Sequence, residues 1–152
     1  MSVLRTSIHG RKFGLGHYGE LVGNEIQLSR PCVDATVTVS DEGATVANQR
    51  DITIQLLDAD GNDIDYVETV EVMLFTTAAR TAFVVTGGST GIAIGTDGAL
   101  LAVVAKKYFL ATSESDGDID LTWTDTGTEA AAIGIRLPNG RIVMGDQLLT
   151  NA

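Results

Sequence analysis

The stretch from Gly91 to Thr124 is the feature that most constrains the fold of this chain. Two turn signals, Thr96-Asp97-Gly98 and Ser115-Asp116-Gly117, interrupt it, and glycine accepts the positive φ that tight turns require. The apolar, β-branched and aromatic run at 100–112 predicts one long strand between these turns. Residues 119–124 then alternate between apolar and polar side chains, which is the pattern of a strand with one buried face. The stretch predicts an antiparallel β-meander and contains no catalytic group.

The same pattern of short strands and turns extends over most of the chain. Further strands are predicted at 26–28, 33–39, 52–56, 67–76, 81–85, 130–137 and 141–144, with 146–152 as a final strand or a tail. Pro138-Asn139-Gly140 is a strong hairpin signal between two of them. No segment has a convincing helical period with caps. About nine or ten short strands predict an all-β antiparallel sandwich. The strand order, jelly-roll-like or immunoglobulin-like, stays open.

The first part of the chain differs from the rest. A length of 152 residues suits one domain with its own core. Residues 1–23 are rich in glycine and have no sustained period, so they predict an extended N-terminal arm, with the β-sandwich domain at 24–152. Such an arm buries little by itself. It is therefore expected to be disordered, to pack on its own domain or to become ordered on a partner.

The charge of the chain is strongly acidic and unevenly distributed. The net charge is −10, of which residues 1–22 contribute +2 and the remainder −12. An acidic body repels nucleic acid and anionic membranes, so we expect neither as a partner. The first fifteen residues lack the apolar segment of a secretory signal, and the apolar run at 99–105 is too short to span a bilayer. We therefore expect a soluble protein that is made inside a cell.

Candidate catalytic groups are few. Residues 14–19 match the letters of a dinucleotide-binding fingerprint, but no strand precedes them and no helical pattern follows, so a glycine-rich turn is the better interpretation. His9 and His17 both lie in the arm, which is a poor frame for a general base. Cys32 is the single cysteine, which excludes an intrachain disulfide, and a small buried apolar group is its most common role.

Acidic turns are the only candidate metal ligands. One turn contains Asp58, Asp60, Asn62 and Asp63, and another contains Asp116, Asp118 and Asp120. The first imitates an EF-hand loop, but Asp63 stands where glycine is needed and Thr69 where a bidentate glutamate is needed. Solvated turns are the simpler interpretation, so we expect no metal and no other cofactor.

The remaining candidates also have structural interpretations. Trp123 lies on the apolar side of its predicted strand and is expected in the core rather than in a sugar-binding platform. Lys106 and Lys107 adjoin Tyr108, but one basic pair in an acidic body is not a nucleic-acid footprint. No enzyme signature is present, so we expect a protein that is not an enzyme.

Several segments together resemble a known class of proteins. They are RTSIHGRKFGLGHYGELVG near the N-terminus, GIAIGTDGALL, AKKYFLATSESDGDIDLTWTDTG and the hairpin IRLPNGRIVMG. These segments resemble small virion structural proteins of tailed bacteriophages, in particular head decoration (cement) proteins. The resemblance implies a β-sandwich unit that binds the outer capsid lattice and braces neighbouring major capsid subunits. It also implies a homo-oligomer, dimer or trimer, that is made in the bacterial cytoplasm and resides on the capsid surface.

The arm is the expected anchoring element of such a protein, because arginine and aromatic side chains are enriched in interface cores. The expected contact residues are Arg5, Ile8, Arg11, Phe13, Leu15 and Tyr18. One alternative is a tail, baseplate or fibre accessory protein, which location on the particle would distinguish. A second alternative is a β-sandwich module that binds calcium or a glycan, which a chelator or a glycan panel would reveal.

Overall fold

A computed structural model describes residues 19–22, 25–28 and 30–151 of the chain. The chain divides into two compact units, Met1–Pro31 and Cys32–Ala152. In the first unit, β1 (Gly19–Val22) pairs with β2 (Glu25–Leu28) in an antiparallel hairpin. The sequence placed the start of the sandwich domain at residue 24, but the strand expected at 26–28 pairs with β1 instead. The difference arises because a sequence pattern predicts that a segment is a strand but does not identify its partner strand.

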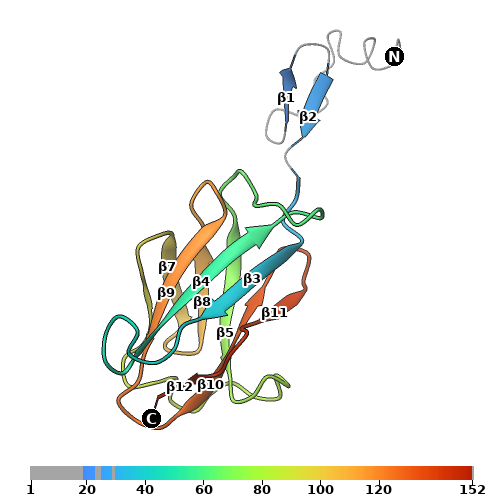
Figure 1. Cartoon of the computed structure of the whole chain (residues 1–152). Coiled ribbons are helices and arrows are strands. Elements are labelled where there is room, and N and C mark those ends of the chain that lie inside the picture. The colour runs from blue at the N-terminus through green and yellow to red at the C-terminus, as the bar shows by residue number, and fades with distance from the viewer. Residues whose placement is uncertain (1–18, 23–24, 29, 152) are drawn as a thin grey trace. The chain divides into compact units, whose positions relative to one another are not determined.

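The second unit is an antiparallel β-sandwich, as the sequence predicted. The four-stranded sheet has the order β3 (Asp34–Val39), β4 (Gln49–Leu57), β9 (Asp118–Thr124) and β6 (Gly91–Ile94). The other sheet has the order β11 (Ile142–Met144), β10 (Ala130–Arg136), β5 (Thr69–Phe75), β8 (Tyr108–Thr112) and β7 (Ala99–Val104), and β12 (Leu149–Thr150) also pairs with β10. Figure 1 shows the sheets face to face. In the described ranges, no helix is long and apolar enough to cross a membrane.

The strand order combines nested and crossed pairs. β4 pairs with β9, and the intervening strands β5 and β8 pair with each other in the opposite sheet, as in a long hairpin rolled up into two sheets. β5 also pairs with β10, and this pair crosses the β4–β9 pair, as in an immunoglobulin sandwich, where the second strand pairs with the fifth and the third with the sixth. The strand order therefore has features of both arrangements that the sequence left open.

The predicted meander at 91–124 is wrong in two respects. First, β6 and β9 lie in the four-stranded sheet, whereas β7 and β8 form a hairpin in the six-stranded sheet. Second, the run at 100–112 is two strands rather than one. The break occurs at Ala105-Lys106-Lys107, where Lys106 has a positive φ of 61° and Lys107 N–H donates to the Val104 carbonyl. Since this turn contains no glycine, aspartate or proline, the sequence carries no signal for it.

Most of the other predicted strands are confirmed. The alternation at 33–39 and 119–124 corresponds to β3 and β9, whose apolar residues are buried. The hairpin around Pro138-Asn139-Gly140 corresponds to β10 and β11. The strand expected at 81–85 is wrong: only an isolated bridge joins Phe83 to Phe75, because the segment meets the last residues of β5 and then turns away.

The core lies between the two sheets. Trp123 is fully buried there, and its indole N–H donates to the Gly87 carbonyl over 3.2 Å, which confirms the expected core position. The largest fully buried residues around it are Ile52, Ile54, Leu56, Leu74, Ile119, Leu121, Ile133, Ile135 and Leu149. Burial on this scale holds the two sheets together as one rigid unit.

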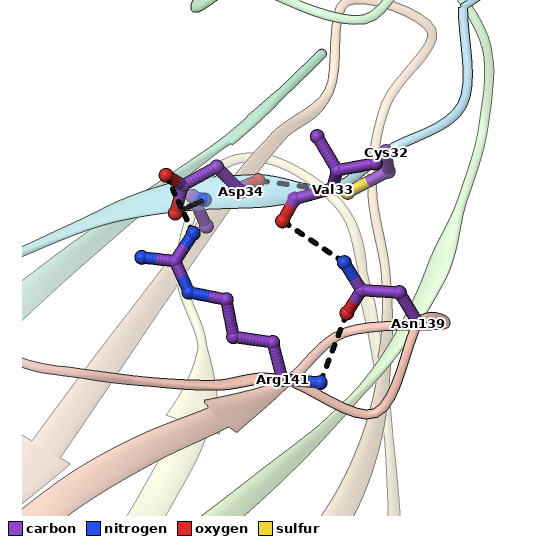
Figure 2. A network of polar contacts seen from close by, with 6 residues as sticks. Cys32, Val33, Asp34, Asn139 and Arg141 are labelled. Atoms are coloured by element: carbon purple, nitrogen blue, oxygen red, sulfur yellow. Dashed lines mark hydrogen bonds and ion pairs between the residues drawn. The ribbon is translucent and has the colours of Figure 1, made fainter. Parts of the chain in front are cut away.

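The edge strand β3 is closed by the segment that contains β11. Figure 2 shows Asn139 Nδ2 donating to the Val33 carbonyl, 3.0 Å away, and the Arg141 guanidinium 2.8 Å from the Asp34 carboxylate. The Asn139 side chain also accepts the Arg141 backbone N–H. These contacts satisfy polar groups at the margin where the two sheets meet.

Candidate interaction surface

The two outer faces of the sandwich differ in chemistry. Outward residues of the four-stranded sheet are polar except for Leu57 and Ala93. The polar ones include Asp34, Thr36, Thr38, Asp51, Thr53, Gln55, Asp118, Asp120, Thr122 and Thr124. The other outer face, together with the adjoining Phe83, carries an apolar set that we name the apolar face: Met73, Phe75, Phe83, Leu101, Val104, Tyr108, Leu110, Ala132, Ile142 and Met144. An outer face of an antiparallel sheet is usually polar. The apolar face is therefore the candidate functional site.

The centre of the apolar face is a small second cluster, separate from the main core. Met73, Phe75 and Ala132 are buried there against Tyr108, Ile142 and Met144. The cluster closes because Gly134 has no side chain between them. A Cβ at Gly134 would lie 2.9 Å from Phe75 Cε2 and 3.1 Å from Met144 Sδ.

Exposed apolar side chains extend this cluster on two sides. Phe83 stacks on Phe75 with ring centroids 5.5 Å apart and remains 49% exposed. Towards β7, Leu101 is 64% and Val104 51% exposed. Exposed apolar residues are normal when they are scattered singly, but a contiguous group on one face indicates an interaction site.

The apolar face carries almost no net charge. Glu71 is the one acidic residue that points outward from the six-stranded sheet, within the described part of the chain. Arg136 Nη1 lies 3.3 Å from its carboxylate, which offsets the charge. Tyr108 also contacts Glu71, and burial followed by that contact raises the pKa of the Tyr108 hydroxyl. On the opposite face, burial and then Asp120 raise the pKa of Asp118.

The six anchor residues expected in the arm lie outside the described residues, as do His9, His17 and positions 14–18 of the glycine-rich motif; Gly19 begins β1. Cys32 is described and is 3% exposed. Burial, with a contribution from Glu68, raises the pKa of its thiol to about 11. A thiol with that pKa is protonated at neutral pH and is a poor nucleophile, so the expected role as a buried apolar group is confirmed.

Aspartates of both acidic groups accept hydrogen bonds from nearby protein groups. Asp58 Oδ1 accepts the backbone N–H groups of Asp60 and Asn62 at 2.8 and 2.9 Å. Asp120 accepts hydroxyl groups from Thr53 and Thr96 at 3.1 and 2.6 Å. Within the described part of the chain, no three His, Cys, Asp or Glu side chains gather in a way that suits a metal ion.

One lysine of the basic pair Lys106-Lys107 has a structural role. Lys106 Nζ donates to the carbonyls of Gly88 and Ser89 at 3.2 and 2.6 Å. It thereby ties the β7–β8 turn to the loop that precedes β6. This lysine is therefore engaged within the sandwich rather than presented to a ligand.

Sequence reasoning missed the apolar face, although the sequence contains a signal for it. Val72-Met73-Leu74-Phe75 and Tyr108-Phe109-Leu110 are continuous apolar runs rather than alternating ones. Side chains alternate between the two faces of a strand, so such a run supplies apolar groups to both. In each run one set packs in the core and the other forms the apolar face.

Comparisons with known proteins add little to this description. No protein-family model and no curated protein matches the chain. Among solved structures, the chain is similar to a cohesin module from a family 33 glycoside hydrolase of Clostridium perfringens. The two are 17% identical over 78% of this chain and 92% of that chain, with a TM-score of 0.38. The fold assignment therefore rests on the strand pairing itself.

Proposed function

We propose that this chain is a phage head decoration protein without enzymatic activity. In this role it binds the outer capsid lattice and braces neighbouring major capsid subunits. The observation that carries the proposal is the apolar face on an otherwise polar and acidic sandwich. The resemblance of the sequence segments to head decoration proteins supplies the identity of the partner.

The composition of the apolar face suits a protein partner. Aromatic side chains and methionine are enriched in the cores of protein interfaces, and charged residues are depleted there. Phe83 and Tyr108 are the exposed or half-buried aromatic residues of this face and are the best candidates for energetic hot spots. A single contact of this size need only be modest, because many copies bind the same lattice and the bracing effect accumulates over the particle.

The N-terminal unit is the second proposed contact. Residues 1–22 have a net charge of +2 whereas the remainder has −12, and Arg5, Arg11, Phe13 and Tyr18 are residue types that interfaces favour. Two linked contacts bind more tightly than either alone, because the second forms at a high effective concentration. In this proposal the sandwich supplies rigidity and the arm supplies an anchor.

A binding assay on phage particles that lack this protein tests the apolar face. We expect Phe83→Ala and Leu110→Lys each to weaken binding by about tenfold, the range of an interface hot spot. The matched control for Leu110→Lys is Thr36→Lys, which adds the same charge at an exposed position on the polar outer face. Equal binding by all three variants would contradict the proposal that this face contacts the capsid.

Cryo-electron microscopy of complete particles tests the location. Density for the sandwich on the outer capsid supports the decoration role. Density in the tail, baseplate or fibre would assign the chain to an accessory protein there. If the chain is missing from the particles, both phage roles fail, and thermal unfolding with a chelator and a glycan panel then tests the binding-module alternative.

A further inference from the structure

The edge strands β3 and β7 of the sandwich differ in whether other segments hydrogen-bond to their outer side. Along β3, Asp146 N–H donates to the Val37 carbonyl and Gln147 Nε2 to the Val39 carbonyl, at 3.1 and 3.2 Å. β7 is at the opposite margin of the sandwich (Figure 1), and within residues 30–151 no strand pairs with its outer side. An edge of this kind presents alternate backbone N–H and C=O groups that are available to another strand.

The side chains of β7 do not protect this edge. Ala99–Val104 contains neither a charge nor a proline, the two residue classes that natural edge strands use to prevent pairing. Leu101, Val103 and Val104 are 64%, 50% and 51% exposed. A register shift between Ala102 and Val104 is the one irregularity, and it leaves the first part of the strand regular.

The charges beside β7 indicate which strand would pair with this edge. Residues 98–113 contain no acidic residue, although the net charge of the chain is −10. Asp97 comes just before β7, and Lys106 and Lys107 come just after it. If two β7 strands pair antiparallel, the end of one lies beside the beginning of the other. Lys107 of each copy then approaches Asp97 of the other copy, so the edge is complementary to itself.

We propose that two copies of this chain form a two-fold dimer by antiparallel pairing of their β7 strands. The pairing joins the two six-stranded sheets and their apolar faces into one continuous surface. A two-fold axis is the simplest symmetry for such an association, because each copy uses the same patch. This inference goes beyond the proposed function, since the dimer forms without any capsid.

Sedimentation of the full-length chain over a range of concentrations tests the dimer. Leu101→Lys places a charge on the edge and is expected to weaken dimerisation by at least about tenfold. Val67→Lys is the matched control, because Val67 is 57% exposed and lies outside β7. Circular dichroism establishes that both variants remain folded.

A charge exchange tests the orientation of the two strands. Asp97→Lys and Lys107→Glu should each weaken the dimer, and the double variant should recover most of the loss, because the pairing of opposite charges is restored. Hydrogen exchange supplies an independent readout: amides of β7 should become more protected as the chain concentration rises. Independent, additive losses in the double variant would overturn the antiparallel arrangement.

Two results would overturn the dimer altogether. One is a chain that stays monomeric up to about 1 mM, which excludes all but the weakest association. The other is a trimer, which antiparallel pairing of identical edges does not produce. Particle binding is scored separately with Asp97→Lys: a monomeric variant that still binds particles supports the β7 interface and leaves the decoration role intact.

Discussion

Cys32 illustrates how one buried residue reports on the fold. Its thiol is buried in the core, and its backbone N–H donates to the Tyr66 hydroxyl over 2.7 Å. Desolvation favours the neutral thiol, and the nearby Glu68 charge adds to the effect, which is why the pKa rises to about 11. The sequence excluded an intrachain disulfide, but the position of this residue in the core gives its chemistry.

The thiol should make stability depend on pH. Since the pKa is near 9.0 in the unfolded chain and about 11 in the folded chain, the unfolded state loses its proton first as the pH rises. The free energy of unfolding should therefore fall between these two values. Urea unfolding of the natural chain and Cys32→Ala measures this. The difference between them should shrink from about pH 9 to about pH 11, and a constant difference would contradict the assignment.

At the scale of elements, the Glu129 carboxylate makes several of the hydrogen bonds that hold the loop before β6. Glu129 accepts the backbone N–H of Gly88 at 2.7 Å, and it also accepts the backbone N–H and hydroxyl of Thr86. Burial alone would raise the pKa of Glu129, but these hydrogen bonds lower it overall. The loop in turn supports the core, because the Gly87 carbonyl accepts the indole N–H of Trp123.

Glu129→Gln should lower the free energy of unfolding by about 1 kcal/mol at neutral pH, because the charge that strengthens three hydrogen bonds is lost. A carboxylate with a depressed pKa stabilises the fold above its unfolded pKa and loses this effect as the pH falls through the folded pKa. The difference between the natural chain and the variant should therefore vanish in acid. Asp63→Asn, at an exposed position, is the control. A difference that persists in acid would show that the charge is not the cause.

At the scale of the whole molecule, the chain combines a small N-terminal unit with a sandwich that has one polar and one apolar outer face. The acidic residues on the four-stranded sheet keep that side solvated, while the apolar face is the part of the sandwich that gains most from contact with another protein. Neither unit needs the other to complete its strand pairing, since β1 pairs with β2 and the sandwich pairs internally.

Deletion of residues 1–22 should therefore leave the sandwich folded and remove the proposed binding to capsids. The physical reason is that this deletion removes the proposed anchor but no strand of the sandwich. Circular dichroism and the thermal unfolding transition check the fold, and co-sedimentation with particles checks binding. Undiminished binding by the shortened chain would rule out the arm as an anchor.

The sequence by itself determined the features that depend on neighbouring residues. Alternation placed Trp123 and the apolar side chains of β3 and β9 in the core, and Pro138-Asn139-Gly140 marked a hairpin. These predictions succeeded because side-chain alternation and turn conformation are local properties of the backbone. The all-β sandwich followed from the number and spacing of such signals.

The tertiary structure decided which strands meet. Strand pairing joins residues that are far apart in the chain, such as Ile54 with Ile119 and Met73 with Tyr108, and no local pattern specifies those partners. The break at Lys106 was hidden for a related reason, because both faces of the run at 100–112 are apolar and the hydrophobic pattern does not change there. The apolar face exists only once the two sheets stack, since stacking determines which side of each strand enters the core and which remains on the surface.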